Sequence, residues 1–137
     1  MSPVWIVDID GTLALRGDRR PYDWHRVGED TPNPPVVAVV QALLLAGHPV
    51  AFVSGRKEQC RRQTEMWLAT HVTSLGDTEV WMRGDHDDRP DTVVKREIYT
   101  RRFAHRPVAG VIDDRASVTA MWRSLGLTVL QVAEGNY

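Results

Sequence analysis

Short apolar runs rich in β-branched residues alternate with longer helical stretches, and this alternation constrains the fold more than any other feature of the chain. The apolar runs predict strands over residues 4–9, 48–54, 79–83, 107–112 and 127–132. Helices are predicted over residues 57–71, 91–104 and 115–125, preceded by a helix that begins at Pro34 and is closed by Gly47. Because the strands are almost continuously apolar, both faces of the sheet must be covered. The pattern predicts an α/β fold, a Rossmann-like parallel sheet with helices on both faces.

The length of 137 residues favours one domain, residues 1–137, with a flap over about 15–33 where glycine, proline and charged residues gather. A formal net charge of −1 excludes a protein that binds nucleic acid or membranes through bulk positive charge. Cys60 is the only cysteine, which excludes an intrachain disulfide and suits a reducing compartment. No secretory signal or membrane span is visible, so we expect a cytoplasmic protein without a membrane partner, and a homo-oligomer stays open.

Polar residues follow three of the predicted strands at their carboxyl ends, where open α/β sheets bind ligands. The first strand ends in DIDGT (residues 8–12), the second in SGR (54–56) and the fourth in DDR (113–115). Strand alternation places Asp8 and Asp10 on one face. Each segment alone is also typical of a turn or a helix cap, but their recurrence at three strand ends favours one site. Clustered carboxylate oxygens favour Mg²⁺ over Zn²⁺. Mg²⁺ held by carboxylates commonly takes its remaining ligands from water and phosphate oxygens, which predicts phosphoryl-transfer chemistry.

These segments, together with the lysine of VVKREI (Lys95), resemble the haloacid dehalogenase (HAD) superfamily of phosphohydrolases. The resemblance is stronger still to one branch, the phosphatase domain of bacteriophage polynucleotide kinase-phosphatase. The segments that carry it are PYD (21–23), VVK (93–95), IDDR (112–115), MWR (121–123) and QVA (131–133). The similarity spans residues 4–137 in the order of the family, and it implies the HAD fold.

The resemblance implies a role for each carboxylate. Asp8 is expected to be the nucleophile that forms an aspartyl-phosphate, and Asp10 to be the general acid and base. Mg²⁺ is expected to bind Asp8, the backbone carbonyl of Asp10 and the pair Asp113-Asp114. We favour Asp114 as the direct ligand of that pair, and the sequence leaves the choice open.

Other positions are expected to hold the phosphate. Ser54, the Gly55 amide and Lys95 match the groups that bind its oxygens, and Thr12 is expected to fix the loop. Arg56 suits a bidentate phosphate contact.

Two further arginines match positions of the phage branch. Arg19 lies in the flap, and Arg83 is the last residue of the third strand. Arg16 and Arg20 stay open as alternatives for the flap arginine.

The spacing of the motifs leaves no room for a large cap domain, since Asp10 and Ser54 are 44 positions apart and Arg56 and Lys95 are 39 apart. An open site admits the end of a polymer. We therefore expect a phosphatase for 3′-phosphate ends of DNA or RNA, in a repair or phage-like setting. The enzymatic alternative is a phosphatase for mononucleotides or other small phosphate esters. The non-enzymatic alternative is a catalytically inactive nucleotide-binding module. No G-x-x-x-x-G-K-[ST] loop occurs, so a free-standing phosphatase without a kinase half is expected.

Aromatic residues of the flap permit two interpretations. Tyr22 and Trp24 are placed either to stack on a nucleobase or to pack the flap onto the domain. Met66 and Trp67 are expected in the core.

Overall fold

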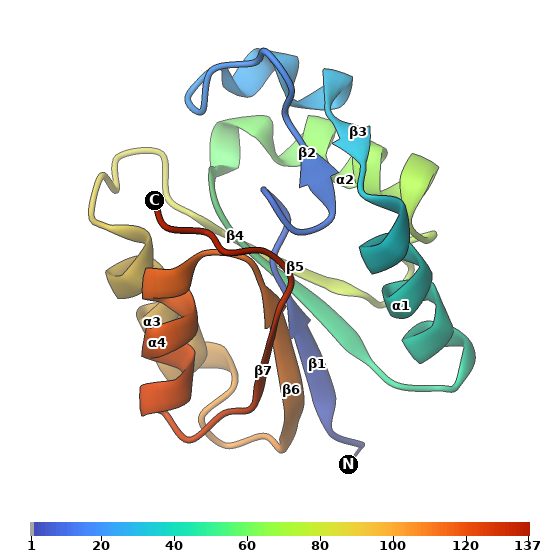
Figure 1. Ribbon diagram of the computed structural model, residues 1–137, viewed down its shortest axis with the longest axis vertical. Coiled ribbons are helices and arrows are strands. Elements are labelled where there is room, and N and C mark those ends of the chain that lie inside the picture. The colour runs from blue at the N-terminus through green and yellow to red at the C-terminus, as the bar shows by residue number, and fades with distance from the viewer. Residues whose placement is uncertain (1) are drawn as a thin grey trace.

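Five parallel strands form the central sheet of the computed structural model, which describes residues 2–137 (Figure 1). The strands are β1 (Val4–Val7), β4 (Val50–Lys57), β5 (Glu79–Arg83), β6 (Val108–Asp113) and β7 (Val129–Gln131). Their order in the sheet is β5-β4-β1-β6-β7, so β1 lies in the middle and pairs with both β4 and β6. The carboxyl ends of these three strands are therefore neighbours, which is where an open α/β sheet binds its ligand.

Helices cover both faces of the sheet (Figure 1). One face carries α1 (Pro34–Leu45), α2 (Arg61–His71) and the 3₁₀ helices η1 (Trp24–Glu29) and η2 (Glu58–Cys60), and the other carries α3 (Asp91–Arg102) and α4 (Ala116–Ser124). Adjacent strand residues face opposite layers, so Phe52 packs with the first group and Val53 with the second. None of the helices between residues 2 and 137 has the length and apolar character that a membrane crossing needs.

The predicted α/β fold is confirmed, and the strand over 79–83 has its predicted bounds. The second strand runs further than predicted. β4 continues to Lys57 with a register shift against β5, so α2 begins at Arg61 rather than at residue 57. The expectation for Met66 is wrong, because this side chain is 59% exposed on the outer face of α2, beside the buried Trp67.

A structured flap connects β1 to α1. Within it, β2 (Ala14–Leu15) pairs antiparallel with β3 (Thr31–Pro32), and η1 lies between the two strands. The indole N–H of Trp67 donates to the carbonyl oxygen of Asp30 (2.7 Å), which ties the flap to α2. The segment from β1 to α1 holds this flap and no cap domain, as the spacing predicts.

Candidate active site

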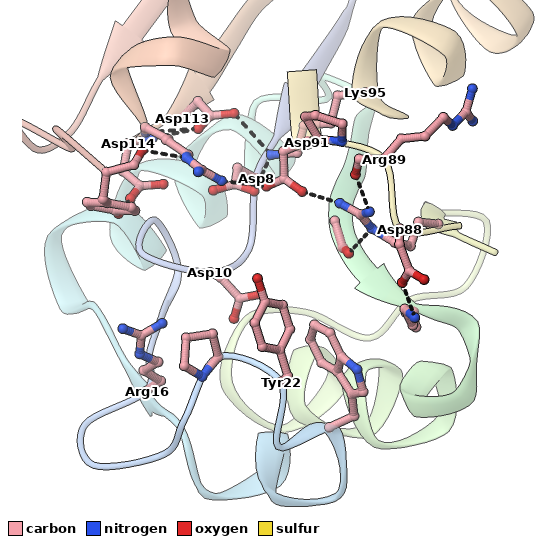
Figure 2. A pocket seen from close by; sticks show the side chains of 18 of the residues that line it. Asp8, Asp10, Arg16, Tyr22, Asp88, Arg89, Asp91, Lys95, Asp113 and Asp114 are labelled. Carbon is pink, nitrogen blue, oxygen red and sulfur yellow. Dashed lines mark hydrogen bonds and ion pairs between the residues drawn. The ribbon is translucent and has the colours of Figure 1, made fainter. Parts of the chain in front are cut away.

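A cavity of about 780 Å³ opens at the carboxyl ends of β1, β4 and β6. Asp8, Asp10, Lys95 and Asp114 line it. Figure 2 shows Asp8, Asp113 and Asp114 on one side of the cavity and the flap residue Tyr22 on the other, with Asp10 nearer to Tyr22 in this view. The volume is in the range of sites that hold a small organic ligand, and exceeds what an isolated phosphate needs.

A lysine from the helix layer that contains α3 and α4 holds Asp8 at the floor of this cavity. The backbone N–H of Asp8 donates to the Ile112 carbonyl (2.9 Å), which continues the pairing of β1 with β6. Lys95, one turn into α3, donates from Nζ to Asp8 Oδ1 (2.7 Å) and lies 3.3 Å from Asp113 Oδ2. The Thr12 hydroxyl lies 3.0 Å from the other Asp8 oxygen. Both Asp8 and Lys95 are buried. The structure thus brings together residues that are 87 positions apart in the chain.

Three buried carboxylates form a compact oxygen cluster. Asp8, Asp113 and Asp114 each present an oxygen within 4.8 Å of those of the other two. An all-oxygen donor set with this spacing fits a hard divalent cation.

The two carboxylates after β6 differ in how many donors they already bind. Asp113 Oδ1 accepts the backbone N–H groups of Asp114 (2.8 Å) and Arg115 (3.2 Å). Its Oδ2 accepts from Lys95 (3.3 Å) and the Trp122 indole (3.2 Å). The acceptor positions of Asp113 are therefore filled. Asp114 contacts side-chain hydroxyls instead, those of Thr12 and Tyr137. Asp114 therefore has more capacity left to bind a cation than Asp113.

The charges of this cluster perturb one another. Burial raises the pKa of Asp8 well above its ordinary value, and the nearby Asp113 raises it further against the opposing effect of Lys95. Burial also raises the pKa of Asp114. Burial alone lowers the pKa of Lys95, but Asp113 and Asp8 outweigh it, so the pKa is raised and the ammonium stays charged. One ammonium faces three carboxylates, which leaves an excess of negative charge for a cation to neutralise.

Asp10 belongs to a second network, built from two arginines and one more acid. Arg56 donates to Asp10 from Nη2 (2.8 Å) and Nε (3.0 Å), and Arg19 lies 3.3 Å away. Asp30 binds both guanidinium groups, at 2.8 Å from Arg19 Nε and 3.0 Å from Arg56 Nη2. The side chains of Arg56 and Asp30 are fully buried, whereas that of Asp10 is 43% exposed toward the cavity. Desolvation by itself raises the pKa of Asp10, but Arg56 and then Arg19 outweigh it, so the pKa lies below its ordinary value.

The structure brings the other predicted residues to the site at different depths. Gly55 and Arg83 line the cavity. Ser54 is buried, and its Oγ accepts the backbone N–H of Arg56 (3.1 Å). Arg56, expected to contact phosphate, directs its donors to Asp10, Asp30 and Thr64 instead, so its guanidinium lies beneath Asp10.

Two further expectations concern arginines and glycine. Among the flap arginines, Arg19 is buried against Asp10 and Asp30, whereas Arg16 and Arg20 are exposed. A Cβ at Gly55 would collide with the carboxylate of Asp91, so any larger residue there would displace the Asp91 side chain.

Three residues of the site belong to no sequence motif, so the sequence alone does not identify them. Asp30 lies in the flap without a recognisable pattern around it. The sequence predicts only that Asp91 begins a helix, but in the structure this residue forms an ion pair with Arg83 and lies 3.3 Å from Arg115. Tyr137 brings its hydroxyl from the C-terminal segment to Asp114.

Three comparisons place the chain among known proteins. Residues 2–137 match the family described as the polynucleotide kinase PNKP phosphatase domain. A putative bifunctional polynucleotide kinase/RNA ligase of Autographa californica nuclear polyhedrosis virus is 30% identical over 131 residues, which cover 93% of this chain and 19% of that protein. A chain of the Pnkp1/Rnl/Hen1 RNA repair complex superposes with a TM-score of 0.91 and 34% identity, over 99% of this chain and 44% of that one.

A more distant match concerns the fold alone. D,D-heptose 1.7-bisphosphate phosphatase from B. bronchiseptica, solved with magnesium and phosphate, has a TM-score of 0.61 and 14% identity, over 94% of this chain and 79% of that one. The chain spans less than half the length of the viral protein and of the RNA repair complex chain that it matches. None of these matches supports a homo-oligomer.

Proposed function

Since the chain belongs to the family of polynucleotide kinase PNKP phosphatase domains and is a phosphomonoester hydrolase, we propose that it removes the phosphate from the 3′ end of a nucleic-acid strand. The observation that carries the proposal is the placement of Asp8. Its carboxylate lies 2.7 Å from Lys95 Nζ at the floor of an open cavity, and Asp10 is exposed to the same cavity. The names of the two relatives make RNA ends the favoured substrate. Membership of a phosphatase family favours an enzyme over the inactive nucleotide-binding module.

The proposed reaction has two steps. An oxygen of Asp8 attacks phosphorus, the bond to the 3′-oxygen breaks, and Asp10 donates a proton to that leaving oxygen. A water molecule then attacks the aspartyl-phosphate, Asp10 takes its proton, and Asp8 and inorganic phosphate are released. The lowered pKa of Asp10 favours its ionised form before substrate binds. A phosphate dianion beside Asp10 raises the pKa of Asp10, because a like charge disfavours ionisation. This effect opposes that of Arg56 and Arg19 and favours the protonated acid.

Lys95 and the backbone N–H of Gly55 are proposed to bind the phosphate oxygens. Lys95 stays protonated between its acidic neighbours and supplies fixed positive charge where negative charge develops. The Gly55 site has no side chain, which keeps the backbone accessible from the cavity.

HAD phosphatases depend on magnesium in general, and the oxygen cluster fits this ion. We propose that Asp8, Asp114 and the carbonyl of Asp10 hold it, with Asp113 orienting the loop. When bound, Mg²⁺ neutralises charge on the phosphate and on the cluster.

The setting of the reaction is also a proposal. Related chains carry kinase and ligase in their names, or occur in an RNA repair complex. We infer that this domain acts on broken ends that a kinase and a ligase also process.

Substrate discrimination tests the proposal. Purified protein with Mg²⁺ is assayed on RNA and DNA oligonucleotides that carry either a 3′- or a 5′-phosphate, and on free 3′-mononucleotides. We expect phosphate release from the 3′ ends only, and none with Asp8→Asn. Equal rates on 3′ and 5′ ends would contradict the regiospecificity. Faster turnover of the mononucleotide would favour the small-ester phosphatase, which a cavity of about 780 Å³ also admits.

A further inference from the structure

Two aromatic side chains of the flap have different surroundings. Trp24 is partly buried against the core layer that contains α1 and α2, and holds the flap in place. Tyr22 is 80% exposed. The two rings meet edge to face, with centroids 5.9 Å apart and planes at 74°. Trp24 therefore supports the ring of Tyr22 from one side and leaves the ring open to solvent elsewhere.

The backbone that carries Tyr22 is fixed by a residue of the site. Arg19 donates from Nη1 to the carbonyl oxygens of Arg20 (3.2 Å) and Pro21 (3.4 Å), and its Nη2 lies 3.3 Å from Asp10. The Asp23 N–H closes a turn onto the Arg20 carbonyl (3.1 Å). The position of Tyr22 is thus set relative to Asp10 by short contacts rather than by a long mobile loop.

Both rings line the same cavity as Asp8 and Asp10. Figure 2 shows Tyr22 rising from the flap wall toward the carboxylates, with Asp10 between them in this view. A phosphate bound at Asp8 would fill only the floor of this cavity of about 780 Å³. The group that a 3′-phosphate brings with it is a ribose and a planar base, and exposed aromatic rings stack on any base.

We propose that Tyr22 stacks on the nucleobase of the terminal nucleotide while its 3′-phosphate lies at Asp8, with Trp24 as the edge-on support of the ring. This inference rests on the proposed function. Arg16, which lines the cavity from the same flap, favours every anionic ester, whereas the neutral ring of Tyr22 adds a preference for a planar group. Tyr22 would thereby favour nucleotides over other phosphate esters, without selecting a sequence.

The test compares two oligonucleotides with a 3′-phosphate that differ only in the last residue, which either carries a base or is abasic. Wild type is expected to process the complete end with a kcat/KM about 10-fold higher than the abasic end, as base stacking predicts. Tyr22→Ala should remove this difference by slowing the complete end and leaving the abasic end unchanged. Tyr22→Phe should keep the preference, and Tyr22→Leu, apolar without a ring, should lose it.

A binding measurement separates this inference from the reaction. Asp8→Asn is mixed with a 3′-phosphorylated oligonucleotide whose last base is the fluorescent 2-aminopurine. Stacking on Tyr22 should quench the fluorescence, and Asp8→Asn combined with Tyr22→Ala should not quench it. Because Tyr22 is exposed, its variants should unfold at the wild-type temperature. Equal kcat/KM of wild type on complete and abasic ends, or quenching that persists without the ring, would overturn the inference while 3′-phosphate hydrolysis stands. Absence of 3′-phosphate hydrolysis by wild type would overturn both proposals.

Discussion

Replacing Asp30 by asparagine removes the charge that joins two buried guanidinium groups. Asp30 accepts from Arg19 Nε (2.8 Å) and Nη2 (2.9 Å) and from Arg56 Nη2 (3.0 Å), and its side chain has no exposed surface. Removing one partner from a buried ion pair costs about 3–5 kcal/mol, because the remaining charges stay buried without compensation. We therefore expect Asp30→Asn to lower the free energy of unfolding by about 3–5 kcal/mol, measured by urea denaturation.

The same substitution should change the pH dependence of the reaction. Without Asp30, the charges of Arg19 and Arg56 act on Asp10 alone, so its pKa, already below the ordinary value, should fall further. A general acid must be protonated, and activity is lost as pH rises through its pKa. The alkaline limb of the kcat profile should therefore move to lower pH in Asp30→Asn, measured by phosphate release from a 3′-phosphorylated oligonucleotide.

Asp18 offers a matched control in the same flap. Its side chain is 94% exposed, and it lies 3.4 Å from Arg26. Exposed pairs contribute about 0–1 kcal/mol, so Asp18→Asn should leave both stability and the pH profile near wild type. If Asp30→Asn unfolds within about 1 kcal/mol of wild type, the buried network does not stabilise the flap as argued. If its alkaline limb does not move, the network does not set the pKa of Asp10.

Three further substitutions test the floor of the cavity. Mg²⁺ at 100 times its Kd should stabilise wild type by about 2.7 kcal/mol in thermal unfolding, and Asp114→Asn should lose this stabilisation. The metal-free form of Asp114→Asn should be more stable than metal-free wild type, because one of the repelling carboxylate charges is gone. Lys95→Met should abolish turnover and destabilise the metal-free protein, since Asp8 and Asp113 lose their buried cation; retained turnover would exclude the phosphate-binding role. The lowered pKa of Asp10 stabilises the fold above the unfolded pKa, about 3.9, and this contribution is lost as pH falls through the folded value. Urea unfolding between pH 2 and 6 should therefore show a steeper loss for wild type than for Asp10→Asn, and parallel curves would contradict the assignment.

The strand ends of this protein were predictable because parallel strands obey a simple rule. Apolar runs that end in Asp8, Ser54 and Asp113 must place those residues at one edge of the sheet, and the structure does so. Lys95 is different. Nothing in its own helix marks it as buried, and only the family resemblance brought it to the site, where it binds Asp8 across the layers.

The features that the sequence did not reveal depend on where individual side chains point and on which groups they bind. Strand periodicity does not show that β4 continues to Lys57 with a register shift. The guanidinium of Arg56 suits a bidentate phosphate contact, but it donates to Asp10 instead, a partner that residue type alone does not reveal. Asp30 looks like any other acid of a polar flap, because the two arginines that neutralise it come from separate segments. The buried face of α2 holds Thr64, Trp67 and Leu68, and the apolar character of Met66 does not show that this residue lies outside it.

The buried network makes the flap and the proposed acid one mechanical unit. Arg19 belongs to the flap, Arg56 to the sheet, and Asp30 binds both, while both guanidinium groups also contact Asp10. Lifting the flap would separate Arg19 from Asp10 and expose paired charges, which is costly, so the flap holds its place without a cap domain above it. The cavity beside this network is lined by Asp10 and Arg19 together with Asp8 and Lys95. The proposed general acid is therefore held in place by the flap and the sheet together, so its position does not depend on a cap domain closing over the site.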